Sequence, residues 1–96
     1  MTPPFSVTAT PHYDRLARRL TKQHREFDEV EDRAREILQH DPYNRSRRHA
    51  IRKLEGVSQG EGQFRLTLGR WRFRYDISSP EVMPHYCGLW REDTYR

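Results

Sequence analysis

The segment QFRLTLGRWRFRYDI, which runs from residue 63 to residue 77, constrains the fold more than any other part of the chain. Apolar and polar residues alternate on both sides of Gly69-Arg70, and alternation with period two is typical of half-buried strands. A two-residue loop in which Gly69 supplies a positive φ predicts an antiparallel hairpin. The apolar face of this hairpin must then pack against a second layer.

The register of this hairpin assigns every side chain to a face. The apolar face holds the pairs Leu68–Trp71, Leu66–Phe73 and Phe64–Tyr75. On the other face Thr67 lies opposite Arg72, and Arg65 lies opposite Arg74. Like charges directly opposite each other destabilise a sheet by a few tenths to about 1 kcal/mol. Either these arginines extend into water, or an anion with several oxygens binds between them. Three arginines on one face favour the second interpretation, with a phosphodiester as the natural ligand.

The N-terminal half predicts a short strand followed by helices. Residues 5–10 alternate and are β-branched, as in a strand. Thr10 can cap a helix that has Pro11 at its first position. Apolar residues at helical spacing then predict two amphipathic helices, at about residues 11–23 and 27–40. One bent helix is the alternative, because neither Gly nor Pro marks the join. Asp41-Pro42 ends the helical run.

The C-terminal half predicts further extended structure. Residues 42–56 are polar and basic, and they fit either a turn of helix or an extended crossover. Residues 81–90 predict a last strand, in which Pro84 marks an edge or an interruption. The sequence therefore predicts one α+β domain over residues 1–96. In it, an N-terminal strand and a two-helix hairpin pack on an antiparallel-rich sheet of about four strands.

The charge and cysteine content limit the class of protein. Lys and Arg number 18 against 14 Asp and Glu, a formal charge of +4. Arginine, which recognises phosphate in a bidentate manner, dominates the cations. Cys87 is the only cysteine, which excludes an internal disulfide and a multi-cysteine zinc site. No signal-peptide or membrane-spanning stretch is present, and the histidines lack metal spacing. We expect a cytoplasmic protein without a membrane partner or a metal.

Four pieces of the sequence together resemble one family. They are DP at Asp41-Pro42, RKLEG at residues 52–56, the hairpin segment, and REDTY at residues 91–95. In this combination the chain resembles the RelE/ParE superfamily of toxins from bacterial type II toxin–antitoxin systems. The resemblance covers nearly the whole chain, from Phe5 to Tyr95. It implies the same α+β fold.

The resemblance also implies an activity. RelE-like members are metal-independent endoribonucleases that need no cofactor and cut mRNA in the ribosomal A site. Their partners are the ribosome, the mRNA and a cognate antitoxin that neutralises them. The first alternative is a ParE-like inhibitor of DNA gyrase without nuclease activity. A second alternative is a degenerate toxin that only binds RNA or an antitoxin.

By position, the resemblance implies four catalytic residues. Arg65 matches a basic residue at the scissile phosphate, and Arg72 matches a hairpin arginine that contacts the same phosphate. Arg91 matches the arginine of the terminal strand, and Tyr95 matches the tyrosine proposed as general base. One departure is Thr67, where some members have a second hairpin lysine.

Further residues are expected to hold the RNA or to replace the base. The RNA-binding residues are Arg48, Arg52, Lys53 and Arg74. Trp90 could stack on a base, whereas the register places Trp71 in the core. His85 and His49 are alternative bases, because a histidine pKa lies near neutrality. Each of these histidines is otherwise a surface or packing residue.

The implied chemistry is self-cleavage of RNA. The 2′-OH attacks the adjacent phosphorus and leaves a cyclic phosphate and a 5′-OH. A tyrosine is a poor base at its usual pKa of about 10, but neighbouring arginines favour the phenolate and lower that pKa. Arg65 and Arg72 would stabilise the charge of the transition state. Removing one such donor typically slows a reaction by about 10²–10³-fold.

Overall fold

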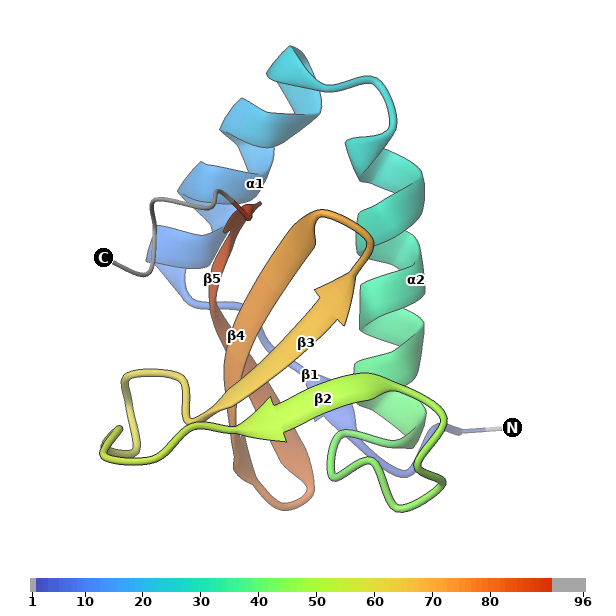
Figure 1. The fold of residues 1–96 in the computed structure, drawn as a ribbon, viewed down its shortest axis with the longest axis vertical. Coiled ribbons are helices and arrows are strands. Elements are labelled where there is room, and N and C mark those ends of the chain that lie inside the picture. Colours follow the sequence, from blue (N-terminus) through green and yellow to red (C-terminus); the bar gives the residue numbers. More distant parts are fainter. Residues whose placement is uncertain (1, 91–96) are drawn as a thin grey trace.

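The structure, a computed structural model, describes residues 2–90. These residues form an α+β fold in which two helices lie on the same side of a mixed sheet (Figure 1). The elements are β1 (Ser6–Val7), α1 (Pro11–Gln23), α2 (Phe27–His40), β2 (Ala50–Lys53), β3 (Phe64–Leu68), β4 (Trp71–Ser78) and β5 (Glu81–Leu89). The strand order is β1-β5-β4-β3-β2. The α+β class is confirmed. Within residues 2–90, no helix is long and apolar enough to cross a membrane.

The two helices have the bounds that the periodicity predicts. Thr10 caps α1, because its hydroxyl accepts the backbone N–H of Tyr13 at 3.1 Å, and Pro11 takes the first helical position. The backbone of His24 is extended and its N–H donates to the carbonyl of Leu20 at 2.8 Å. This residue ends α1, so the alternative of one bent helix is wrong.

The predicted hairpin register is confirmed. Leu68 lies opposite Trp71, and the turn residue Gly69 has a φ of 58°. The apolar face of the hairpin is the core of the molecule, where Leu66, Phe73 and Tyr75 are buried. They pack against buried residues of α2, and Figure 1 shows both helices behind the hairpin. The arginine face is therefore the face of the sheet that the helices do not cover.

The predicted number of about four strands is wrong, because the sheet has five strands in the described residues. The additional strand is β2, which pairs antiparallel with β3 from within the basic segment. Only Ile51 of β2 is partly buried, so no apolar alternation marks the strand. β1 pairs parallel with β5 and is shorter than the predicted residues 5–10.

Pro84 interrupts the ladder without ending the strand. β5 pairs with β4 along its length, and the register shifts at Arg74/Tyr75, where Tyr75 lies opposite Pro84. The predicted interruption is confirmed. The predicted alternative of an edge is wrong, because β5 lies between β1 and β4. The carbonyl of Pro84 still accepts the N–H of Thr10 at 3.1 Å.

Candidate functional site

The sheet register brings arginines from three strands into one row. Arg52 of β2 lies opposite Arg65 of β3, and Arg65 lies opposite Arg74 of β4. Tyr86 of β5 continues the row beside Arg74. Arg72 stands two residues from Arg74 on the same face. Side chains that are directly opposite lie about 5 Å apart at Cβ, so this row concentrates positive charge.

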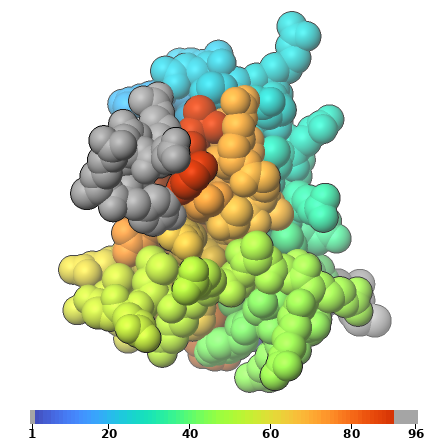
Figure 2. Space-filling model, viewed as in Figure 1, coloured from blue at the N-terminus to red at the C-terminus, as the bar shows by residue number. Residues whose placement is uncertain are grey.

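Three of these arginines line a hollow of about 490 Å³ on this face. We call it the arginine hollow. It is lined by Leu54, Glu55, Val57, Arg65, Arg72, Arg74, Tyr86, Leu89 and Trp90. One wall comes from β3, β4 and β5, and the other comes from the loop between β2 and β3. In Figure 2 this loop, in green and yellow, stands beside the surface of the hairpin.

Arg74 fixes the loop wall to the sheet. Its Nε and Nη2 donate to the carbonyl of Gly62 at 3.2 and 3.1 Å. Gly62 has a φ of 86°, and a Cβ built on it would lie 2.9 Å from the Cβ of Arg74. Both observations require glycine at this position. Arg74 is therefore partly committed to structure and has fewer donors left for a ligand.

Asp76 of β4 anchors the same loop to the sheet. Its side chain is fully buried, and it accepts the backbone N–H groups of Gly60, Gly62 and Gln63 at 2.7 to 3.1 Å. Burial by itself would raise the pKa of this carboxyl, but the three hydrogen bonds and nearby His85 outweigh it, so the pKa is lowered. Asp76 stays ionised and holds the loop in one conformation.

Arg72 has few hydrogen-bond partners for its guanidinium among the described residues. Its Nη1 makes only long contacts, 3.4 Å, to the carbonyls of Gly69 and Trp71. Its Nε is buried and has no hydrogen-bond partner among the described residues. Its guanidinium carbon lies 5.2 Å from the ring centre of Trp90. A buried donor without a partner is unfavourable, and an anion in the hollow would satisfy it.

The electrostatic balance of this face is positive. In the described part of the chain, neither Arg52, Arg72 nor Arg74 forms an ion pair with a carboxylate. Arg70, at the hairpin turn, differs because it pairs with Glu26 at 3.0 Å and joins the turn to the start of α2. The arrangement suits a ligand with several negatively charged oxygens, bound by charge-assisted hydrogen bonds.

Other predicted residues lie away from the hollow. Lys53 lies opposite Phe64, on the helix side of the sheet, and its Nζ is 5.8 Å from that ring. Arg48 is exposed in a separate groove beside α2. Arg52 shares the row but does not line the hollow. Arg91 and Tyr95 lie outside the described residues.

Neither of the two candidate histidines lines the hollow. The backbone of His49 is held by Asn44, which accepts its N–H at 3.1 Å and donates to its carbonyl at 2.8 Å. His85 Nε2 lies 2.8 Å from Asp76 Oδ2, yet the N–H does not point at the oxygen. His85 therefore lies beside the buried carboxylate of Asp76 rather than in the hollow.

Tyr86 is a phenol of the hollow that the sequence prediction missed. It is 39% exposed, and its ring lies against Gly88, where an added Cβ would displace the ring. The pairing of Tyr86 with Arg74 was detectable in principle, because alternation places Tyr86 and Gly88 on one face of β5. The β-bulge next to Pro84 shifts the pairing of β5 with β4, so the sequence alone does not show that Tyr86 lies beside Arg74.

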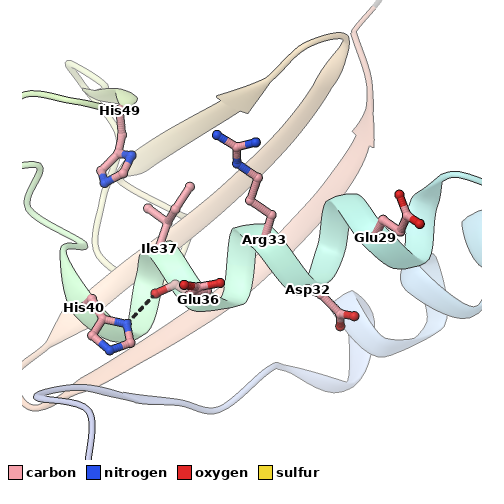
Figure 3. Close-up of a pocket in the computed structure, with 7 residues that line it drawn as sticks. All are labelled: Glu29, Asp32, Arg33, Glu36, Ile37, His40 and His49. Atoms are coloured by element: carbon pink, nitrogen blue, oxygen red, sulfur yellow. Dashed lines mark hydrogen bonds between the residues drawn. The ribbon is translucent and has the colours of Figure 1, made fainter.

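A larger hollow of about 720 Å³ lies along α2, but its chemistry does not suit phosphate. It is lined by Glu29, Asp32, Arg33, Glu36, Ile37, His40 and His49. Figure 3 shows the side chains of α2 spread along the helix and His49 on a separate segment, with one hydrogen bond among them, from His40 Nδ1 to the carbonyl of Glu36 at 2.9 Å. Its three carboxylates would repel an anion, so the arginine hollow is the better candidate.

Metal sites and relatives do not add to this assignment. Within residues 2–90, no three His, Cys, Asp or Glu side chains gather as metal ligands would. Comparisons with protein-family models, with characterised proteins and with solved structures found no match.

Proposed function

We propose that this protein is a RelE-like toxin that cleaves mRNA on the ribosome. The observation that carries the proposal is the arginine hollow, where Arg65, Arg72 and Arg74 line one cavity together with aromatic side chains. Its size and charge suit one nucleotide of a single strand, with the phosphodiester on the arginines. The resemblance of the hairpin and of the segments at residues 41–42, 52–56 and 91–95 supplies the family, and with it the antitoxin as partner.

The reaction follows from what a phosphodiester does beside these groups. A base takes the proton of the 2′-OH, the 2′-oxygen bonds to phosphorus, and the bond from phosphorus to the 5′-oxygen breaks. That 5′-oxygen leaves with a proton from an acid, and a 2′,3′-cyclic phosphate remains. Arg65 and Arg72 stabilise the charge that develops on the phosphorane oxygens. No metal is needed for this chemistry.

The base of the reaction has two phenol candidates. Tyr95 is implied by the family resemblance. Tyr86 is the phenol that lines the arginine hollow in the described structure. His49 and His85 are weaker candidates, since neither lines the hollow.

Primer extension on ribosomes programmed with a defined mRNA tests this function. We expect discrete cuts in the A-site codon, and a loss of about 10²–10³-fold in rate with Arg72→Ala. Arg18→Ala on α1 is the matched control, since it removes an arginine far from the hollow. Tyr95→Phe and Tyr86→Phe, assayed in parallel, identify the base.

Absence of cuts with folded protein would overturn the nuclease proposal. DNA cleavage by gyrase in the presence of the protein would then identify the ParE-like alternative. Salt-sensitive RNA binding without products would identify a degenerate, binding-only toxin.

A further inference from the structure

The arginine hollow is lined by two chemically different sets of side chains. Arg65, Arg72 and Arg74 lie on the central strands β3 and β4. Apolar and aromatic side chains flank them on both sides, namely Tyr86, Leu89 and Trp90 on the β5 side and Leu54 and Val57 in the loop after β2. Trp90 and Tyr86 are each 39% exposed, whereas Trp71, the other tryptophan, is 3% exposed. A phosphate needs no apolar wall, but an unstacked nucleobase binds best against aromatic and aliphatic side chains.

The cationic and aromatic groups are adjacent at Trp90. The backbone N–H of Trp90 donates to the carbonyl of Arg70 at 2.6 Å, which fixes the residue beside the hairpin turn. The guanidinium of Arg72 lies 5.2 Å from its ring centre. A nucleotide can therefore place its phosphate on Arg72 and its base against Trp90 at the same time.

The opposite wall is already ordered. The N–H of Leu54 donates to the carbonyl of Gln63 at 2.7 Å and closes the loop at its base. Asp76 holds the far end through Gly60 and Gly62. A wall that is fixed before binding loses little conformational entropy when the ligand enters.

Glu55 adds a polar group to the hollow. No hydrogen bond or ion pair engages its carboxylate among residues 2–90, although three arginines line the same hollow. A carboxylate only accepts hydrogen bonds. The Watson–Crick edge of guanine presents two adjacent donors, N1–H and N2–H. Adenine and cytosine present an amino group beside an acceptor nitrogen, and uracil presents a single N–H between two carbonyls.

We propose that the β5 side of the arginine hollow, at Trp90, is a subsite for one unpaired guanine base. The base stacks on Trp90, Glu55 accepts its N1–H and N2–H, and the neighbouring phosphate binds Arg72. This inference rests on the proposed function, because it takes RNA as the ligand of the hollow. The subsite would not bind a base-paired guanine, because the N1–H and N2–H groups of that base already donate to its pairing partner.

Fluorescence titration of the full chain with trinucleotides tests the subsite. The central sugar is 2′-deoxy, so that no cleavage occurs, and the central base is guanine, adenine, cytosine, uracil or absent. Because Trp71 is buried, quenching of tryptophan emission on binding reports on Trp90. We expect guanine to bind about tenfold more tightly than the other bases, as a bidentate contact provides. The abasic compound should cause no quenching.

Two variants assign the effect to its residues. Glu55→Gln should keep binding but reduce the preference for guanine to about twofold or less, since an amide also donates. Glu61→Gln, in the same loop but outside the hollow, is the control and should keep the full preference. Trp90→Ala lacks the fluorescent reporter and the abasic compound does not quench it, so these affinities are measured by displacement of a fluorescently labelled trinucleotide. Trp90→Ala should weaken all four base-containing trinucleotides toward the affinity of the abasic one.

The outcomes separate this inference from the proposed function. Equal binding of guanine and the abasic compound, with loss of both in Arg72→Ala, would overturn the guanine subsite and leave the phosphate site standing. A guanine preference that survives in Glu55→Gln would also overturn it. A-site cutting without any trinucleotide binding would overturn the subsite alone. Absence of both cutting and binding would overturn both proposals.

Discussion

Asp76 is the single residue on which the wall of the hollow depends. It is fully buried and accepts three backbone N–H groups of the loop. The sequence gives no sign of this role, because the residue sits on the arginine face of β4 where a solvated charge is expected. A carboxylate buried under backbone donors is recognised only when the loop conformation is known.

We expect Asp76→Asn to lower the free energy of unfolding by about 1–3 kcal/mol at neutral pH, as the loss of buried charge-assisted bonds does. The folded state lowers the pKa of Asp76. Its contribution is therefore complete above the unfolded pKa of about 4 and is lost as the pH falls through the folded pKa. The difference between wild type and variant should shrink in acid.

Urea denaturation at neutral pH and at about pH 3 measures this difference. Asp32→Asn, on the exposed side of α2, is the control and should change stability little at either pH. A gap between wild type and Asp76→Asn that stays constant from neutral to acid would contradict the linkage.

A second residue-scale prediction concerns glycine. Gly62 and Gly56 both have a positive φ, of 86° and 72°, but only Gly62 faces a close neighbour, the Cβ of Arg74. Alanine at either position costs about 1–2 kcal/mol for the left-handed backbone. We expect Gly62→Ala to be more destabilising than Gly56→Ala, because it adds the clash. Thermal unfolding of the pair checks this, and equal melting temperatures would count against the close approach.

At the scale of elements, the sequence predicted those helices and strands that bury apolar side chains at a regular spacing. The hairpin register and both helices follow from apolar side chains at period two or near 3.6, and the structure places them as predicted. The sequence did not predict β2, because hydrogen bonds to β3 rather than buried side chains define this strand. The hairpin register also predicts that the arginines of the hollow share one face of the sheet. Tyr86 and the loop wall do not, since a bulge and backbone amides position them.

The row of arginines predicts a conflict between stability and binding within the sheet. Arg52 lies opposite Arg65, so Arg52→Thr should stabilise the fold by a few tenths to about 1 kcal/mol at low salt. The gain should vanish at about 0.5 M salt, where the Debye length is only a few Å. Lys53→Thr, the next residue on the same edge strand, points to the other face and is the control. Urea melts at both salt concentrations measure the effect; a gain that persists at high salt would point to strand propensity instead.

At the scale of the whole molecule, the two large hollows differ in charge and lie on different surfaces. The arginine hollow lies on the face of the sheet away from the helices, and the carboxylates of the other large hollow lie along α2. RNA should therefore approach from one side. Three phosphate contacts predict a slope of about −2 in a plot of log affinity against log salt for single strands.

We expect Arg72→Ala to reduce the magnitude of this slope by about 0.7, since one phosphate contact is removed. Arg18→Ala should leave the slope unchanged, because α1 covers the other face. Fluorescence anisotropy with a labelled, non-cleavable RNA at several salt concentrations measures both. Equal slopes in all three proteins would place the RNA elsewhere on the surface.

The parallel pairing of β1 with β5 has a consequence for the timing of folding. Ser6 lies opposite Glu81, so the strand that begins the chain waits for the strand at the far end of the described structure. β5 also stands between β1 and β4, so β1 has no strand to pair with until β5 arrives. Contacts this distant in sequence form late. The helices therefore leave the ribosomal tunnel before the sheet that they cover, and the wall that Tyr86 and Leu89 add to the arginine hollow forms only once synthesis has passed β5.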